Sequence, residues 1–143
     1  MALFKNYDPG RIVVIWNGIQ IQGYAHDSFV KCSRNEDTFT QKVGANGDVV
    51  RIRNRNRMGK VVLTLQDTSP SNDLLSQAAQ ADERTGLGFG PLLVKDLNGT
   101  TVVQAANAWI TKPADVEYGA DTGNNEWTIT CAELEMTIGG ELV

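Results

Sequence analysis

The sequence contains no long apolar run. Its longest uninterrupted apolar stretch is Ile12–Trp16, far short of the roughly 20 residues that cross a membrane as a helix. The N-terminus, "MALFKNYDPG", has neither the basic start nor the apolar stretch of a signal peptide. We therefore expect a protein that is made and folded in a cytoplasm and does not insert into a membrane.

Side chains that dominate catalysis and metal binding are scarce. There is one histidine, His26, and the two cysteines, Cys32 and Cys131, form no CxxC unit. No GxSxG motif is present, and "GLGFGP" at 86–91 follows a predicted helix, whereas a dinucleotide-binding loop follows a strand. We expect no catalysis, no cofactor and no metal. The thiols are predicted to be reduced and half-buried, with an inter-subunit disulfide as the alternative.

A basic excess is also absent. The chain carries 13 Lys and Arg against 17 Asp and Glu, which gives a net charge of -4. Because phosphate neutralisation supplies most of the affinity for nucleic acid, a dedicated nucleic-acid-binding protein usually has the opposite balance.

Four arginines nevertheless fall at alternate positions in "RIRNRNRMGK": Arg51, Arg53, Arg55 and Arg57. In a β-strand this spacing sends all four side chains to one face. The strip would bind either nucleic acid or acidic groups on another protein surface. The stretch 54–59 has no aromatic side chain on which a base could stack. Together with the net charge, this favours a subunit contact.

Most of the chain is predicted to form β-strands. Asn17-Gly18 and Asn98-Gly99 suit the positive φ angles of tight hairpin turns. The predicted elements are a hairpin over 11–26, a strand over 27–33, a hairpin over 47–67 with its turn within 54–59, a hairpin over 91–112 and one long strand over 125–140.

One helix is predicted within "SPSNDLLSQAAQADERTG", residues 69–86. Ser69 is expected to cap it, with Pro70 at the first helical position, and Gly86 is expected to end it. A narrow apolar stripe would pack the helix against the strands: Leu74, Leu75, Ala78 and Ala79.

A long polar segment, Arg34–Asp48, is predicted as a loop between two strands. Loops of this length are uncommon in compact domains unless they are functional or ordered by a partner. It contains Phe39 and Val43, for which a solvated loop has little use, so we expect both to contact a partner. The alternative is a mobile excursion. No internal repeat or domain boundary is evident, and residues 1–143 are predicted to form one domain.

Glu133 and Glu135 alternate with Leu134 and Met136 near the C-terminus. In a strand this alternation places charge on one face and apolar bulk on the other. The acidic strip is either a solvated outer face or the complement of the arginine strip. In the second case the two strips would meet within one subunit or between subunits.

The segment from "SPSNDLLSQAA" through "TGLGFGPLLVKDLNGTTVVQAANAWITKPADVEYG", followed by "NEWTITCAELEMTIGG", resembles the tail tube proteins of contractile-tailed bacteriophages. The N-terminal "LFKNYDPGRIVVIWNGIQIQGYA" fits the same family. The resemblance covers essentially the whole chain and is most specific at 86–119. It implies a mainly β fold with two packed antiparallel sheets, a β-sandwich or half-barrel, and one flanking α-helix. Such proteins are similar to the tubes of type VI secretion systems and phage-like bacteriocins.

The resemblance also implies an assembly. Copies join into hexameric rings whose inner strands form one continuous β-barrel, and the rings stack into a tube inside a contractile sheath. DNA passes through the lumen as transient, non-specific cargo, and the loop at about 34–48 reaches the next ring. The implied partners are other copies of the chain and the sheath, tape measure, baseplate and tail terminator proteins. The place of action would be the virion tail, after assembly in the bacterial host cytoplasm.

Eight residues are predicted to form subunit interfaces: Arg51, Arg53, Arg55, Arg57, Phe39, Val43, Glu133 and Glu135. A conduit for DNA should not adhere to its cargo, so the arginines are expected at subunit contacts and the lumen is expected to carry more acidic than basic side chains. Two alternatives stay open. One is the tube of a DNA-free contractile injection system, and the other is a β-barrel that binds single-stranded nucleic acid.

Overall fold

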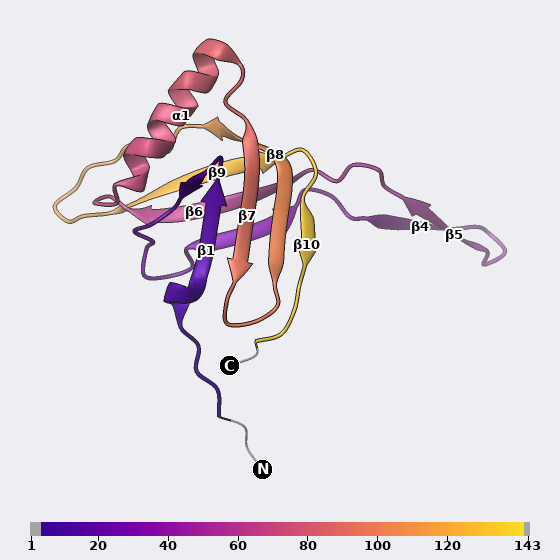
Figure 1. Ribbon diagram of the computed structural model, residues 1–143. Coiled ribbons are helices and arrows are strands. Elements are labelled where there is room, and N and C mark those ends of the chain that lie inside the picture. The colour runs from indigo at the N-terminus through magenta and orange to yellow at the C-terminus, as the bar shows by residue number, and fades with distance from the viewer. Residues whose placement is uncertain (1–3, 142–143) are drawn as a thin grey trace.

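The computed structural model describes residues 4–141. Two layers of antiparallel strands cross one another, one helix lies beside them, and a two-stranded hairpin projects from one end (Figure 1). In chain order the elements are η1 (Pro9–Arg11), β1 (Ile12–Trp16), β2 (Ile19–Gln20), β3 (Val30–Arg34), β4 (Phe39–Val43), β5 (Val49–Arg53), β6 (Gly59–Gln66), α1 (Ser71–Thr85), β7 (Gly90–Asp96), β8 (Val102–Lys112), β9 (Asn124–Cys131) and β10 (Glu135–Thr137).

Strand β8 belongs to both layers. Its first half lies between β7 and β10, and its second half pairs with β9. The front layer is therefore β2-β1-β7-β8-β10, and the back layer is β8-β9-β6-β3. A single hydrogen-bonded sheet thus folds over to make both layers, as in orthogonal sandwiches whose corners are formed by strands that change layer. The predicted fold, two antiparallel layers with one flanking helix, is confirmed.

The corner of the sheet is a bulge in β8. Ala105 lies opposite Leu92 and Ala108 lies opposite Gly90, so two residues of β8 face Pro91 alone. The extra residue bends the strand and shifts its alternation. Val103 and Ala105 are buried before the bulge, and Ala108 and Ile110 are buried after it. Both halves of one strand can therefore turn an apolar side toward the same core.

The strand beside β8 breaks at the same corner. The predicted long strand over 125–140 is wrong as one element, because β9 ends at Cys131 and β10 begins at Glu135. The amide of Ala132 donates to the carbonyl of Asn107 at 3.0 Å, and the amide of Leu134 donates to the carbonyl of Arg57 at 2.9 Å. These bonds attach residues 132–134, between β9 and β10, to β8 on one side and to the segment before β6 on the other.

The core lies between the two layers and under α1. Trp16 and Trp127 are its largest members, and each indole N–H has a partner. Trp16 Nε1 donates to the carbonyl of Ala108 at 3.0 Å, and Trp127 Nε1 donates to Asn72 Oδ1 at 2.9 Å. A buried indole usually finds such a partner, and these two bonds tie β1 to the corner of β8 and α1 to β9.

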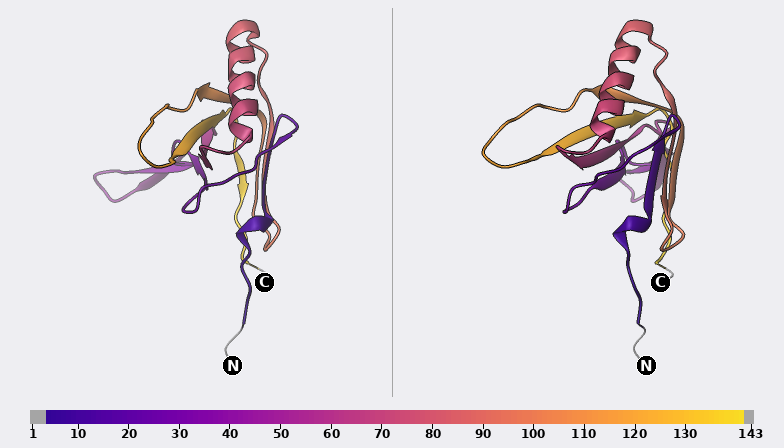
Figure 2. Two further views of the ribbon diagram at one scale, coloured as in Figure 1. Left: turned by 90° about the vertical axis from the view of Figure 1, so that its left-hand side faces the viewer. Right: turned by 60° about the vertical axis from the view of Figure 1, so that its left-hand side comes forward.

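Helix α1 flanks the layers (Figure 2). Leu75 and Ala79 of the predicted stripe are buried and Ala78 packs against the core, but Leu74 is 43% exposed. Gly86 ends the helix with φ 71°, as predicted. The start differs, since the helix begins at Ser71 with Pro70 at the N-cap position.

The Ser69 side chain forms a hydrogen bond with the loop that follows β2. Its hydroxyl donates to the carbonyl of Gln22 and accepts from the amide of Ser71. The residue still serves the start of the helix, although Pro70 holds the cap position.

Two predicted hairpins are present. Asn17 and Gly18 have φ 51° and 80° between β1 and β2, and Asn98 lies in the turn between β7 and β8. The first hairpin is shorter than predicted, because β2 ends at Gln20 and the chain then crosses to the back layer. There Tyr24 bridges to Leu65.

The predicted hairpin over 47–67 is wrong. Strand β5 pairs with β4, while β6 pairs with β3 and β9. The segment predicted as a loop, Arg34–Asp48, supplies β4 and the turn of the real hairpin. That turn is closed by bonds from the amide of Gly44 to the carbonyl of Asp48 and from the amide of Gly47 to the carbonyl of Gly44.

We predict that Gly59→Ala destabilises the subunit. A Cβ at Gly59 would lie 2.5 Å from Leu134 Cδ2 and 2.8 Å from the carbonyl oxygen of Ser33, so the corner would have to move. Overpacking of this kind costs about 1–3 kcal/mol. Chemical denaturation measures the loss. Gly119→Ala is the matched control, because nothing lies within 4 Å of a Cβ there; equal stability of the two variants would contradict the prediction.

Candidate assembly interface

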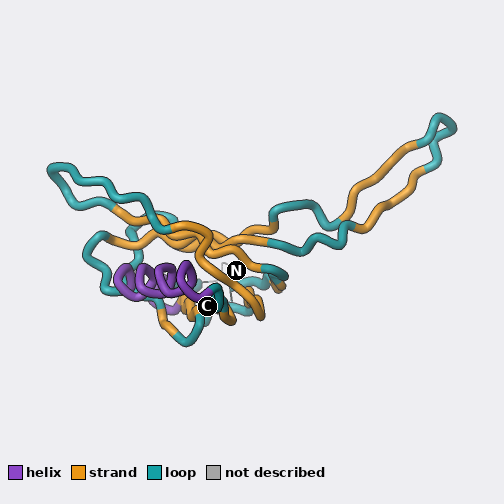
Figure 3. The backbone as a smooth tube through the Cα atoms, turned by 90° about the horizontal axis from the view of Figure 1, so that it is seen from above, coloured by secondary structure: helices purple, strands orange, loops and turns teal. Residues whose placement is uncertain are grey.

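The hairpin formed by β4 and β5 stands away from the body of the protein. Every residue of both strands is exposed, including Val43 at 66%, Val49 at 66% and Ile52 at 47%. Figure 3 shows the hairpin extending on one side of the molecule, well clear of the layers. An isolated two-stranded hairpin is marginally stable in water, so this apolar surface is typical of a segment that a partner covers.

One face of the hairpin combines aromatic, basic and apolar side chains. Residues that lie opposite one another in an antiparallel pair point to the same face, and Phe39 lies opposite Arg53. Arg51 shares this face, with its Cζ 4.2 Å from the centroid of the Phe39 ring. This cation–π contact orients the guanidinium without burying it. Val43 and Val49 extend the same face to the tip.

The four arginines do not lie on one strand. Arg51 and Arg53 both lie in β5, but the strand ends at Arg53. Arg55 and Arg57 lie in the irregular segment that leads to β6. Arg57 pairs with Glu135 of the same chain, with 3.9 Å between Nη2 and Oε1. One point of the arginine strip thus meets the acidic strip within the subunit.

The base of the hairpin is fixed to the corner of the sheet. Arg34 donates from Nε and Nη2 to the carbonyl of Leu134, at 3.0 and 2.9 Å. The amide of Asn35 donates to the carbonyl of Met58 at 3.0 Å, and Asn54 Nδ2 donates to Glu36 Oε2 at 2.7 Å. The hairpin is therefore exposed along its length but held where it leaves the body.

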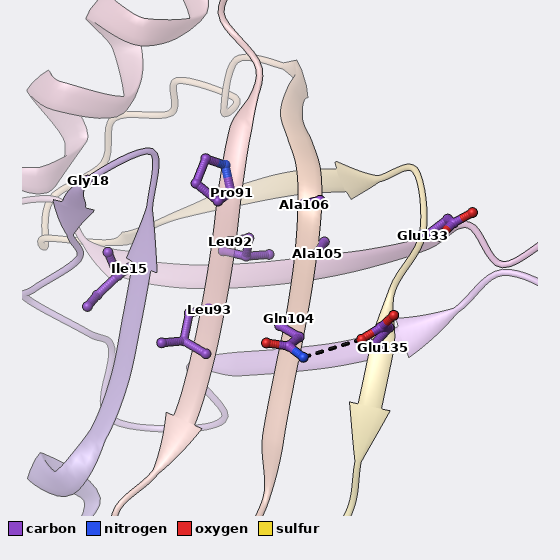
Figure 4. A pocket seen from close by; sticks show the side chains of 10 residues that line it. All are labelled: Ile15, Gly18, Pro91, Leu92, Leu93, Gln104, Ala105, Ala106, Glu133 and Glu135. Carbon is purple, nitrogen blue, oxygen red and sulfur yellow. Dashed lines mark hydrogen bonds between the residues drawn. The ribbon is translucent and has the colours of Figure 1, made fainter.

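Glu133 and Glu135 lie on the outer face of the front layer. They border a depression of about 510 Å³, lined by Ile15, Gly18, Pro91, Leu92, Leu93, Gln104, Ala105, Ala106 and the two glutamates (Figure 4). Gln104 Nε2 donates to Glu135 Oε2 at 3.3 Å. Leu134, between the glutamates, is buried, and Met136 packs against the core, so the predicted alternation is confirmed.

The outer face of the back layer has a different chemistry. Its side chains alternate with the buried residues of β6 and β9 and are mostly polar, although β8 adds the half-exposed Trp109 opposite Thr130: Lys31, Ser33, Lys60, Val62, Thr64, Trp109, Lys112, Glu126, Thr128 and Thr130. Thr111 and Thr130 share a hydrogen bond between their hydroxyls. Hydroxyl, ammonium and carboxylate groups on one broad face suit contact with water.

A second exposed segment, residues 113–123, projects on the side opposite to the hairpin (Figure 3). It carries Asp115, Glu117 and Asp121 and no Lys or Arg. Val116 and Tyr118 are 75% and 92% exposed. Its base is held where Gly123 donates to Asp67 Oδ2 at 2.7 Å.

The back layer ends in two strand edges that have no partner within residues 4–141. Strand β3 pairs only with β6, and residues 109–112 of β8 pair only with β9. Unpaired edges expose backbone N–H and C=O groups and are ready to pair with another chain. These edges were not identified from the sequence.

The cysteines lie on the two strands that flank β6. Cys32 is free and half-buried, and Cys131 is free and buried. Burial raises the pKa of Cys32 to about 11. Burial, with a smaller contribution from Cys32, also raises the pKa of Cys131 to about 11. Both thiols are therefore protonated and poorly reactive at neutral pH.

Residues 4–141 contain no cluster of metal ligands and no helix that could span a membrane. No group of three or more His, Cys, Asp and Glu side chains could hold a metal ion. In the same part of the chain, no helix is long and apolar enough to cross a membrane.

Comparison with known proteins decides the family. Residues 18–139 match the family described as the bacteriophage PhiTE tail tube protein. The chain belongs to this family. It is also 28% identical over 144 residues to "Structural protein ORF10" of Pseudomonas phage KPP10, covering 95% of this chain and 83% of that protein. The resemblance to phage tail tube proteins noted in the sequence is confirmed.

Solved structures of contractile injection systems have the same fold. The sheath/tube terminator of an extracellular contractile injection system, PVC, in its extended state aligns with a TM-score of 0.66 and 14% identity, over 96% of this chain and 100% of that one. The PVC sheath-tube complex aligns with a TM-score of 0.64 and 12% identity, over 92% and 91% of the two chains. The tube-terminating cap of the anti-feeding prophage gives 0.65 and 10%, over 96% and 94%. At these identities the likeness concerns the fold.

We predict that Arg34 and Arg57 contribute unequally to stability. Arg34→Ala removes two charge-assisted hydrogen bonds to a carbonyl at the corner and should lower the free energy of unfolding by about 1.5–3 kcal/mol. Arg57→Ala removes an exposed ion pair between side chains 44% and 55% exposed and should cost less than about 1 kcal/mol. Urea denaturation of both variants measures the difference, and a larger loss for Arg57→Ala would refute the assignment of the anchor.

Proposed function

We propose that this protein is the tail tube subunit of a contractile-tailed phage, a structural protein without catalytic activity. Copies join into hexameric rings, and the rings stack into the conduit through which DNA leaves the virion. The family membership supports the general role. The observation that carries the ring is the pair of unpaired strand edges on the back layer.

Those edges are suited to join identical copies. The strands β3, β6, β9 and β8 alternate in direction, so β3 and the second half of β8 run in opposite directions. Rotation about a ring axis preserves strand direction. When residues 109–112 of one copy meet β3 of the next, the new pair is therefore antiparallel, like every other pair in the layer. Repetition closes the layer into a barrel and leaves no edge exposed.

The two outer faces indicate which side of the layer meets the lumen. We propose that the polar face with Thr64, Thr128 and Thr130 lines it, because a bore filled with water and counterions favours such groups. The front-layer face, with Ile15 and Leu93 in its depression, would lie against a neighbouring subunit, and Glu133 and Glu135 with it.

This assignment changes the expected charge of the lumen. The polar face carries Lys31, Lys60 and Lys112 against Glu126, a small basic excess where an acidic excess was predicted from the net charge. Charges this sparse around the wall are screened over roughly 8 Å at physiological salt. DNA would pass such a wall without forming the continuous phosphate contacts that produce tight binding.

The remaining partners follow from the same role. The hairpin of β4 and β5, with Phe39 and Val43, would bridge successive rings, which is the function predicted for the segment at about 34–48. The relatives of known structure are named as tube and sheath components and as terminators, which supports contacts with a sheath and a terminator protein. Tape measure and baseplate proteins would meet the tube at its lumen and its end. Assembly would take place in the host cytoplasm.

A DNA-free injection tube is the second candidate, because the solved relatives are extracellular injection systems and an anti-feeding prophage. The family match and the curated relative are both phage proteins. They favour the DNA conduit.

We expect purified protein to form rings or tubes in negative-stain electron microscopy, since edge pairing needs no other component. A reconstruction should place β3 of each copy beside residues 109–112 of the next. Dispersed monomers at every concentration and salt tested would contradict the proposed function. Rings joined through the front layer alone would contradict only the edge pairing.

We further expect the polar face to be enclosed in assembled tubes. A Thr128→Cys variant should react with a small maleimide but not with a large polyethylene-glycol maleimide, because only small molecules diffuse freely along the bore. Gln77→Cys, on the exposed side of α1, is the control and should react with both when no sheath is present. The native thiols contribute little background because their pKa values are about 11. Rapid reaction of Thr128→Cys with the large reagent would place this face outside the tube.

A further inference from the structure

The two projecting segments of the protein complement one another in charge. The hairpin from Phe39 to Arg53 carries three basic side chains, Lys42, Arg51 and Arg53, against the single acid Asp48. Segment 113–123 carries three acidic side chains and no basic one. Opposite charges arranged in this way set register and partner choice at an interface. A chain whose total charge is -4 thus concentrates basic groups at one end and acidic groups at the other.

The two segments also share an unusual exposure of apolar groups. Val43 and Val49 at the hairpin tip are each 66% exposed, and Val116 and Tyr118 of the acidic segment are 75% and 92% exposed. Mixed apolar and charged surfaces of this kind are typical of sites that are covered in an assembly. The two segments therefore have opposite charges, and both expose apolar side chains that could pack together.

Their positions exclude contact within one copy. The hairpin and segment 113–123 extend from opposite sides of the body (Figures 1 and 3), roughly along the direction of the back-layer strands. In a ring closed through the edges of those strands, this direction points out of the two open faces of the ring. The hairpin of one ring then meets segment 113–123 of the ring stacked upon it. A contact between two different patches of the same chain is heterologous and propagates without end when it does not close.

We propose that segment 113–123 is the receiving surface for the β4–β5 hairpin of a copy in the adjacent ring. Arg51 and Arg53 pair with Asp115 and Glu117, and the valines of the hairpin tip pack on Val116 and Tyr118. The cation–π contact with Phe39 holds Arg51 ready for this pairing. The proposal rests on the tube function and assigns the partner of Arg51 and Arg53, a surface that sequence patterns alone left open.

A charge exchange tests the proposal. Arg51→Glu with Arg53→Glu, and separately Asp115→Arg with Glu117→Arg, each create like charges across the contact. Since every pair is repeated around the ring, we expect each double variant to reduce the pelletable tube fraction by about tenfold or more, leaving single rings. Combining all four changes restores opposite charges and should recover most tubes. Full-length tubes from either double variant, or no recovery in the combination, would overturn the proposal.

Two controls separate this proposal from the function on which it rests. Lys60→Glu with Arg84→Glu changes the net charge as much as the arginine reversal does, but at exposed positions of β6 and α1 away from the proposed ring edges and projecting segments, and should leave tube formation unchanged. The wild-type chain must form tubes in the same buffer; if it forms no assembly, the tube function itself fails.

A cross-link gives an independent readout. Val49→Cys and Tyr118→Cys in one chain should form disulfide-linked ladders after oxidation of tubes and not after oxidation of dispersed rings. Ladders of equal yield from both samples would contradict a contact between rings.

Discussion

The fold depends on one corner where a continuous hydrogen-bonded sheet changes direction. The bulge opposite Pro91 and the break between Cys131 and Glu135 allow two adjacent strands to turn together. Because both sides of the bend keep their apolar residues inward, one set of strands supplies two layers and a shared core. The hairpin base is attached at the same place, through Arg34 and Gly59. Any change that opens this corner would disturb the core and the projecting hairpin together.

The corner also separates two tasks. The back layer keeps unpaired edges and a polar outer face, and both suit the proposed barrel that encloses water. The front layer and α1 supply the buried apolar surface that a two-stranded or single-layer structure would lack. The strand edges proposed to pair with other copies are therefore supported by a core that lies within the subunit. This division explains how a subunit can keep a buried core while exposing strand edges.

Local patterns predicted the elements whose structure is decided locally. The Asn-Gly turns, the helix ending at Gly86 and the alternation around Leu134 were predicted because each depends on residues close in sequence. The predicted hairpin over 47–67 is wrong because the composition of Val49–Arg53 indicates a strand but does not indicate which strand it pairs with. The sequence "GANGD" at 44–48 is typical of a turn. The strand before it is so polar that the whole segment 34–48 resembles a loop. The four arginines do not form one strip along a strand, because the strand ends at Arg53.

Other features need the three-dimensional arrangement. The unpaired edge at 109–112 exists only because β7 begins at Gly90, opposite Ala108, and no residue type marks it. The acidic character of 113–123 is visible in the sequence, but its position opposite the hairpin is not. Family membership was recognisable from the chain, whereas the contacts between copies depend on which segments the fold brings to each end.

The placement of the hairpin and segment 113–123 on opposite sides gives any stack of these subunits a direction. One end of a tube would expose a ring of basic β4–β5 hairpins, and the other end would expose a ring of acidic 113–123 segments. The two ends could then not be closed by the same surface of one protein, because a surface that binds the basic hairpins has the wrong charge to bind the acidic segments. Growth would also proceed with different kinetics at the two ends, as in other polar filaments. The chemical difference between two short segments would thereby determine which end of a growing tail a given terminating protein can bind.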